Sequence, residues 1–310
     1  MLKTKILVLG STGFIGINLV KQLIIEGAKV MSFSTSTTHP VQKIIHIRGD
    51  LRDDQAVVKI LKLQPEVIIS LVGLSGQVAS DNDPDKYFSV NVIAHIKLLN
   101  NIVKILPKAK FIWSSSRLEY GKPQYLPVDE KHLTAPLSQY GIQKNIISNY
   151  CQFLHLRHRL DTVVLRTSNP YGPHPKTTQG KYNVINYWID QALGNKNLTL
   201  YGSGSQKRDY LYIDDLIEVI IKLIKYKKTT GQIYNIGSGK AISIRQMAQE
   251  IIRQSKKGRL VFIPWPIKFK QVETGDYISD ITRISKDVGW QPKTSIKDGI
   301  RNIISTQENL

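Results

Sequence analysis

Short apolar runs alternate with longer amphipathic segments through the first half of the chain. The runs are continuous and rich in β-branched residues, which is typical of strands buried on both faces. In the longer segments, notably 17–26, Lys86–Leu106 and Tyr140–Arg157, apolar residues recur at helical spacing. The alternation predicts an α/β fold, a Rossmann-type doubly wound parallel sheet covered on both faces. The expected strands are Lys5–Leu9, Lys29–Phe33, Ile44–Ile47, Val67–Leu71, Lys110–Trp113 and Thr162–Leu165.

The second half of the chain is more irregular. Proline and glycine cluster at residues 169–175, 201–205 and 264–266, with short elements between them. We expect a smaller C-terminal substrate-binding lobe over the carboxyl edge of the sheet, where such folds bind ligands. The expected domains are 1–167 for dinucleotide binding, with 206–237 returning to it, and 168–205 with 238–310 for substrate.

Three glycines at a spacing of three follow the first predicted strand, in Gly10-Ser-Thr-Gly13-Phe-Ile-Gly16. Gly10 permits a tight turn, Gly13 lets the backbone approach phosphates, and Gly16 lets the helix pack closely on the strand. The spacing differs from the commoner G-x-G-x-x-G, and a plain turn is the alternative. Between a strand and a helix, the pattern predicts a pyrophosphate at the helix start. Thr12, Phe14 and Ile15 lie in the same turn and are expected to contact the cofactor.

The segment after the second predicted strand bears on the choice of cofactor. A NAD-preferring fold usually offers Asp or Glu to the adenosine ribose there, whereas residues 31–39 contain no acid. Ser34 and Ser36 could donate hydrogen bonds to a 2′-phosphate, so NADP is slightly favoured over NAD, although no Arg is present.

The third and fourth predicted strands are each followed by further candidate cofactor contacts. Asp50 and Leu51 could contact adenine; alternatively Asp50 or Asp53 caps the next helix. Val72, after the fourth strand, completes the expected cofactor-binding set.

Tyr140 and Lys144 are four residues apart, on one face of a predicted helix. A phenol has a pKa of about 10, and a nearby ammonium lowers it, so such a Tyr can move a proton at a carbinol. Ser114–Ser116 follow a predicted strand, and a hydroxyl there could hydrogen-bond the reacting oxygen. An ordinary polar strand end is the alternative for these serines.

The 310 residues include 43 basic and 24 acidic ones, a net charge of +19. The densest basic runs, 222–228 and 253–259, sit near predicted helix ends, where cations suit the helix dipole. A solvated basic surface is therefore favoured over a polyanion site, and nucleic acid is not expected. The single Cys151 excludes an internal disulfide and a cysteine metal cluster, and no metal is expected. No apolar run approaches the ~20 residues that span a bilayer, which favours the cytoplasm.

Seven motifs occur together in one order along nearly the whole chain. In this order they resemble the extended short-chain dehydrogenase/reductases, specifically the sugar-nucleotide epimerase/dehydratase group that includes UDP-glucose 4-epimerases. The motifs are Gly10-Ser-Thr-Gly-Phe-Ile-Gly16, Ser114-Ser-Ser-Arg-Leu-Glu-Tyr-Gly121, Tyr140-x-x-x-Lys144, Leu165-Arg-Thr-Ser-Asn169-Pro-Tyr-Gly-Pro173, Arg208-Asp-Tyr-Leu-Tyr-Ile-Asp-Asp215, Tyr234-Asn-Ile-Gly-Ser-Gly239 and Asp280…Gly289-Trp-Gln-Pro292.

The resemblance implies a role for each matching residue. Tyr140 is the catalytic acid/base, Lys144 binds the nicotinamide ribose and tunes Tyr140, and Ser116 takes the catalytic Ser/Thr position. Asn91 lines the cofactor site. Asn169 and Arg208 contact the substrate diphosphate, and the helices 86–106 and 140–157 form a four-helix interface in a homodimer.

Two departures from the family pattern change what is expected. Dehydratases of the group carry Asp-Glu after the catalytic residue, whereas this chain has Arg117-Leu118, so dehydration is not expected. Glu273 stands where a second phosphate-binding Arg is usual, and a carboxylate opposes a diphosphate. Lys268 and Lys270 are nearby cations that could replace that Arg.

The favoured function is that of an NAD(P)-dependent 4-epimerase acting on a nucleotide-activated hexose. One alternative is an NADPH-dependent 4-keto-6-deoxy nucleotide-sugar reductase. An alternative of another class is a non-catalytic basic binding protein on the same fold.

Overall fold

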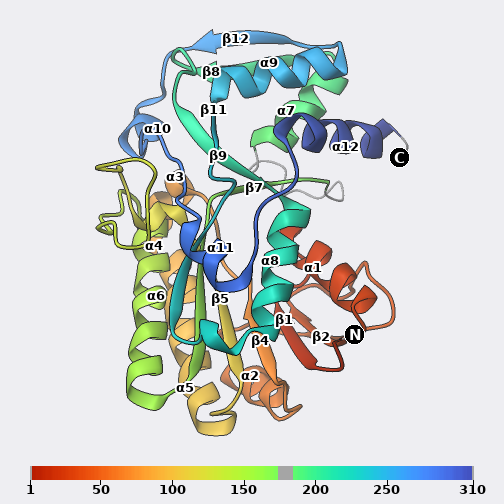
Figure 1. Cartoon of the computed structure of the whole chain (residues 1–310), viewed down its shortest axis with the longest axis vertical. Coiled ribbons are helices and arrows are strands. Elements are labelled where there is room, and N and C mark those ends of the chain that lie inside the picture. Colours follow the sequence, from red (N-terminus) through yellow and green to blue (C-terminus); the bar gives the residue numbers. More distant parts are fainter. Residues whose placement is uncertain (1, 174–183, 309–310) are drawn as a thin grey trace. The chain divides into compact units, whose positions relative to one another are not determined.

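The computed structural model describes residues 2–173 and 184–308 and divides into two compact units (Figure 1). Unit 1 comprises Met1–Glu119, Ser138–Arg166 and Ile217–Tyr234, and unit 2 comprises Tyr120–Leu137, Thr167–Leu216 and Asn235–Leu310. Residues 120–137, 167, 206–216 and 235–237, which the sequence boundaries placed in the first domain, cluster with unit 2 instead. Residues 174 and 175 of the expected irregular segment lie outside the described residues.

A seven-stranded sheet has the order β10-β6-β5-β4-β1-β2-β3. β1 pairs in parallel with both β2 and β4, and the chain builds outward from β1 in both directions. This is the doubly wound arrangement that the sequence predicts, with its switch point between β1 and β4. The strands are β1 Lys5–Leu9, β2 Lys29–Ser34, β3 Ile45–Arg48, β4 Val67–Ser70, β5 Lys110–Ser116, β6 Asp161–Thr167 and β10 Gln232–Ile236.

The helices of unit 1 pack on this sheet. On one face, side chains of α2, α5 and α6 form a continuous core with strand residues such as Phe33 and Trp113. α5 and α6 lie side by side next to β5 (Figure 1). The helices are α1 Phe14–Ile25, α2 Asp54–Leu61, α3 Gln77–Asn82, α4 Pro84–Phe88, α5 Ala94–Ile105 and α6 Gln139–His158, with α8 Ile213–Lys225 shared between the units and short turns at Arg117–Glu119 and Lys227–Thr229.

Two elements differ from the sequence expectation. The helix expected over 86–106 is interrupted by a π-helical turn, Ser89–Ile93, which joins α4 to α5. β5 continues to Ser116 rather than ending at Trp113, and its last two residues, Ser115 and Ser116, are buried. At both places side chains make hydrogen bonds to segments far along the chain, and local periodicity does not reveal such partners.

Unit 2 contains two small sheets, of order β11-β9-β7 and β12-β8. α9 lies beside β8 and β12, and α7 packs on α9 (Figure 1). Among the described residues, no helix combines the length and apolar character needed to span a membrane. The elements are β7 Asn169–Tyr171, β8 Asn197–Tyr201, β9 Lys207–Tyr212, β11 Ala241–Ser243, β12 Arg259–Ile263, α7 Val184–Leu193, α9 Ile244–Ser255, α10 Ile267–Gln271, α11 Thr282–Val288 and α12 Ile296–Glu308.

Candidate active site

The glycine turn joins β1 to α1, and its three glycines differ in what requires them. Gly10 has a φ of +77°, and a Cβ there would lie 2.9 Å from the backbone of Leu71. A Cβ on Gly16 would lie 2.4 Å from the Gly10 oxygen, so close packing of the turn requires this glycine. Gly13 has an ordinary φ of −76°, and a Cβ there would meet only the Gly10 oxygen, at 3.4 Å, among the described residues.

The described residues therefore leave open space beside Gly13, next to the start of α1. This twelve-residue helix has Gly13 at its N-cap and no side-chain cap there. An uncapped helix start beside open backbone favours an anion such as a pyrophosphate. Thr12, Phe14 and Ile15 lie in this turn, and the residues present fit a dinucleotide.

Hydroxyl groups gather where β2 ends. Ser36 donates its backbone N–H to the Ser34 Oγ, at 3.2 Å, and its hydroxyl to the Thr12 Oγ1, at 3.2 Å. His46 Nε2 lies 3.0 Å from the Ser36 carbonyl oxygen. The two serines and Thr12 that the sequence singled out thus lie together, with an imidazole added from β3.

Arg48 lies beside this group, in register with Ser34 across the β2–β3 pair. Paired residues of neighbouring strands share a face of the sheet, and Arg48 is exposed. Sequence reasoning looked for an Arg in the segment after β2 and missed one on the neighbouring strand.

Of the two candidate acids after β3, Asp53 and not Asp50 caps the next helix. Asp53 caps α2 by accepting hydrogen bonds from the N–H groups of Gln55 (2.9 Å) and Ala56 (3.3 Å). Asp50 makes no such cap and pairs with Arg52 at 2.6 Å, which lowers the pKa of Asp50. Leu51 is buried.

Asn91 lies in the π-helical turn, where single π turns often mark functional sites. Its side chain accepts from the Leu74 N–H at 2.8 Å and donates to the Gln143 Oε1 at 2.8 Å. A Cβ on Gly73 would lie 3.3 Å from the Asn91 Oδ1 and 3.6 Å from the Lys144 Nζ. Asn91 therefore joins the segment that follows β4, where Val72 lies, to the helix that carries Lys144.

Tyr140, Lys144 and Ser116 come together within unit 1. α6 begins at Gln139 with Ser138 as its cap, and Ser116, whose Oγ accepts from the Leu118 N–H at 3.2 Å, lies close enough to the Tyr140 hydroxyl to lower its pKa. Lys144 Nζ donates to the Ser114 carbonyl oxygen at 2.7 Å and lies 4.1 Å from the centroid of the Trp113 ring system. The end of β5 thus supplies a partner to each member of the Tyr–Lys pair.

The proton affinities of this pair correct one sequence expectation. Burial raises the pKa of Tyr140 to about 12, with the Ser116 hydrogen bond opposing it and the charge of Glu119 adding to it. Burial also lowers the pKa of Lys144 to about 7. The sequence led us to expect a phenol pKa below its usual value; in the protein alone it lies above that value, because desolvation is the largest influence on Tyr140.

Asn169 and Arg208 both belong to unit 2. Asn169 Nδ2 donates to the Asp209 carbonyl oxygen at 2.7 Å, across the β7–β9 pair. Arg208 is nearly buried; its Nη1 donates to the Gly275 carbonyl oxygen at 2.5 Å, and its Nη2 pairs with the Glu273 carboxylate. The anomalous Glu273 is thus the ion-pair partner of the Arg expected to bind phosphate.

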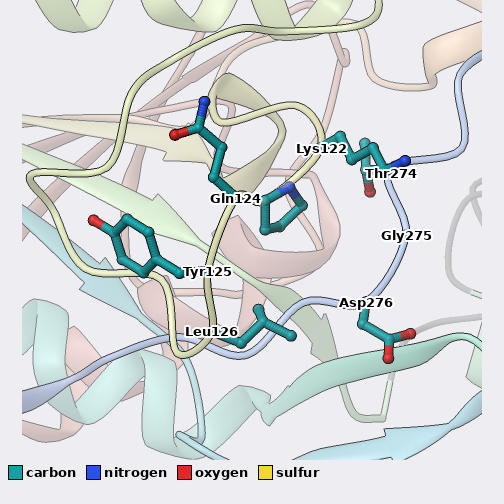
Figure 2. A pocket seen from close by; sticks show the side chains of 8 residues that line it. Lys122, Gln124, Tyr125, Leu126, Thr274, Gly275 and Asp276 are labelled. Carbon is teal, nitrogen blue, oxygen red and sulfur yellow. The ribbon is translucent and has the colours of Figure 1, made fainter.

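A cavity of about 300 Å³ adjoins this loop in unit 2. Thr274, Gly275 and Asp276 form one wall, and Figure 2 shows Gln124, Tyr125 and Leu126 on the segment opposite. Lys122 and Pro123 complete the lining. Because Gly275 lines the cavity and accepts from Arg208, the predicted anion-binding residue is one hydrogen bond from its wall.

Sequence reasoning missed the partners that lie far along the chain. Glu119 is fully buried and pairs with Arg166, although both stand in motifs quoted above. The sequence signal that could have revealed this pair is the presence of charged residues in two strand-end segments. In the parts of the chain that the structure describes, no three His, Cys, Asp or Glu side chains gather as a metal site.

The chain is similar to known proteins in sequence and in fold. A model of the NAD dependent epimerase/dehydratase family matches residues 6–237. A putative UDP-glucose 4-epimerase of Methanocaldococcus jannaschii is 30% identical over 98% of both chains, and a dTDP-4-dehydro-6-deoxyglucose reductase of Escherichia coli is 25% identical over 98% of both. The structure of a UDP-glucose 4-epimerase of Thermotoga maritima with UDP-glucose superposes with a TM-score of 0.90 at 26% identity, covering 98% of this chain and 99% of the other.

The family match spans well over half of the chain, and it includes the glycine turn, the end of β5 and the Tyr140–Lys144 helix. The relatives extend the likeness through unit 2 to nearly the full length. This protein therefore belongs to the NAD dependent epimerase/dehydratase family and is an NAD(P)-dependent enzyme of the nucleotide-sugar epimerase group.

Proposed function

We propose that this protein interconverts the C4 epimers of a UDP-activated hexose. The observation that carries the proposal is that Tyr140 and Lys144, one helical turn apart on α6, both meet the end of β5: Lys144 donates to the Ser114 carbonyl, and Ser116 lies near the Tyr140 hydroxyl. That arrangement suits removal and return of a hydroxyl proton. The relative named as a UDP-glucose 4-epimerase, aligned over 98% of both chains, supports the substrate class.

The chain's own residues divide the chemistry. Tyr140 takes the proton of the substrate hydroxyl and later returns it, while Ser116 shares the hydrogen bond to that oxygen. Lys144 holds the ribose end of the cofactor and stabilises the Tyr140 phenolate when it is charged. A dinucleotide held at Gly13 and the start of α1 would supply hydride acceptance and return.

The test supplies UDP-glucose or UDP-galactose to the purified protein with NAD(P) and follows the conversion of each into the other. Appearance of the second epimer without net cofactor consumption supports the epimerase. Stoichiometric oxidation of NADPH with a 4-keto-6-deoxy sugar nucleotide, and no epimer formed, would replace it with the reductase alternative. The 25% identical reductase keeps that alternative in view.

We further propose that NADP is bound at least as well as NAD. Ser34 stands where an acid would repel a 2′-phosphate, and the Arg48 guanidinium comes from the paired position on β3. Arg48→Ala should weaken NADPH binding by ~10- to 150-fold and leave NADH binding unchanged, since a hydrogen bond to a charged group contributes about 1.5–3 kcal/mol. A hundredfold preference of the wild type for NADH would contradict this proposal.

We infer that a second copy of the chain covers α5 and α6. α6 exposes Ile142, Phe153 and Leu156, of which Leu156 is 71% exposed. These residues recur at helical spacing, so they form one apolar face. Light scattering should give twice the chain mass, and Phe153→Glu should shift the protein to monomer; a monomeric wild type at micromolar concentration would contradict the dimer.

A further inference from the structure

A buried ionic cluster joins β5, α6 and β6 within unit 1. Its centre is the Glu119 carboxylate, which has no exposed surface. Glu119 Oε2 accepts from the Arg166 Nε at 2.7 Å, and Oε1 accepts from the Ser148 Oγ at 2.5 Å. Ser115 Oγ also donates to the Glu119 Oε1. We call Glu119, Arg166, Ser115 and Ser148 the Glu119 cluster.

This cluster lies one helical turn from the catalytic pair. Tyr140, Lys144 and Ser148 follow one another at intervals of four, so they share one face of α6. Their partners, Ser116, the Ser114 carbonyl and Ser115, are consecutive at the end of β5. The helix and the strand therefore meet at three successive points.

We propose that Glu119 is a positioning residue for Tyr140 and Lys144: through Ser148 and Arg166 it holds the catalytic face of α6 against the end of β5. The proposal rests on the proposed function for the roles of Tyr140 and Lys144. What it adds is that the contact of Ser148 with Glu119 fixes the positions of Tyr140 and Lys144 on the same helix face. A displacement of about 1 Å between reacting groups can cost ~10²-fold in rate, so a fixed helix position has a direct catalytic effect.

The charge of Glu119 gives this role a distinct signature. It raises the pKa of Lys144 and also that of Tyr140. The other groups that face the pair are Tyr87 on α4 and His95 on α5, and Asp81 on α3 accepts from the first turn of α6. Burial lowers the pKa of His95 to about 3, so His95 is neutral between pH 5 and 8 and Glu119 is the acid that acts on Lys144.

The experiment compares Glu119→Gln with Ser148→Ala in the full-length protein. Glu119→Gln keeps the shape and a side-chain oxygen but removes the charge, whereas Ser148→Ala removes one contact and no charge. The titration of Lys144 is followed by NMR of ¹³Cε-labelled lysine without substrate, and Lys144→Met assigns the signal. Turnover of the UDP-hexose is measured in parallel.

Both variants should lower kcat by ~10- to 100-fold with KM within threefold. Ser148→Ala removes the third contact itself, and Glu119→Gln loosens it because the ion pair with Arg166 no longer fixes the side chain at position 119. Only Glu119→Gln should lower the pKa of Lys144, by ~1 unit from about 7, since a neighbouring negative charge is lost. A parallel move of the kcat–pH profile to lower pH is expected in Glu119→Gln alone.

A folded Glu119→Gln variant with wild-type kcat and an unmoved Lys144 titration would overturn the proposal. If Glu119→Gln fails to fold because the buried Arg166 cation has lost the Glu119 carboxylate, the double variant Glu119→Gln/Arg166→Gln removes both charges and is judged by the same kcat and NMR measurements. The NMR titration needs no sugar, so a wrong substrate assignment would leave it intact and is distinguishable from a wrong role for Glu119.

Discussion

Glu273→Gln should tighten the binding of a substrate phosphate. In the wild type the Glu273 carboxylate pairs with the Arg208 guanidinium and accepts from the Gly275 N–H at 2.9 Å. Glutamine keeps an oxygen for that N–H and removes the negative charge. A phosphate that approaches Arg208 would then no longer meet a carboxylate beside it.

The size of the effect follows from exposure and distance. Two like charges about 4 Å apart repel by about 4 kcal/mol at an effective dielectric constant of about 20, and by about 1 kcal/mol in water. The Glu273 side chain is 23% exposed, so solvent screens part of this repulsion. We expect a gain of about 1–2 kcal/mol, which corresponds to a ~5- to 30-fold lower Kd.

Calorimetric titration with UDP measures this change directly. Glu250→Gln is the matched control, because it removes one negative charge from an exposed pair on α9 of the same unit. The gain should shrink at high salt and should vanish in Arg208→Ala/Glu273→Gln. Arg208→Ala alone should weaken UDP binding by about 1.5–3 kcal/mol. If Glu273→Gln binds UDP no more tightly than the wild type, the carboxylate does not oppose the phosphate. The Arg208–Glu273 ion pair would then serve only to stabilise the loop.

Three further predictions concern unit 1. Tyr140→Phe loses one hydroxyl, so turnover should fall at least ~10²-fold while NAD(P) titrations stay unchanged; near-normal turnover would remove Tyr140 from the mechanism. Gly13→Val should keep Tm, because valine fits the extended backbone there, but should abolish dinucleotide binding; wild-type NAD(P) affinity in this variant would contradict the prediction. Gly16→Ala should instead lower Tm, because an added Cβ would lie 2.4 Å from the Gly10 oxygen. Lys110→Met removes the hydrogen bonds of Lys110 Nζ to the Leu223 and Tyr226 carbonyls, at 2.9 and 2.6 Å. The free energy of unfolding in urea should fall by about 1–3 kcal/mol, and an unchanged unfolding midpoint would contradict this prediction.

All strands of the large sheet except β10 could be predicted from the chain to within a few residues; β10, Gln232–Ile236, was not among the expected strands. Lys5–Leu9 has the predicted bounds, and Val67–Ser70 ends one residue early. Continuous apolar runs predict these strands because a parallel sheet buries both faces of each strand. Helix α6 likewise matches its predicted span to one residue at each end.

Other features depended on groups that lie far apart in the chain. The π-helical turn forms where Asn91 bonds Leu74 and Gln143, residues 17 and 52 positions away. Residues 120–137 cluster with unit 2, where Val128 bridges to Ser279. Local periodicity carries no record of such partners, so neither feature was predictable from it.

The sequence by itself determined the candidate groups of the site: a glycine turn, a Tyr–Lys pair at one helical turn, and a serine-rich strand end. These signals are local, since each depends on residue type and on spacings of three or four positions. Tertiary structure alone decided the surroundings. It placed Arg48 beside Ser34, and it formed the ion pairs Glu119–Arg166 and Arg208–Glu273. Burial and ion pairing depend on which distant segments meet, and they fix the proton affinities and charges with which the local motifs act.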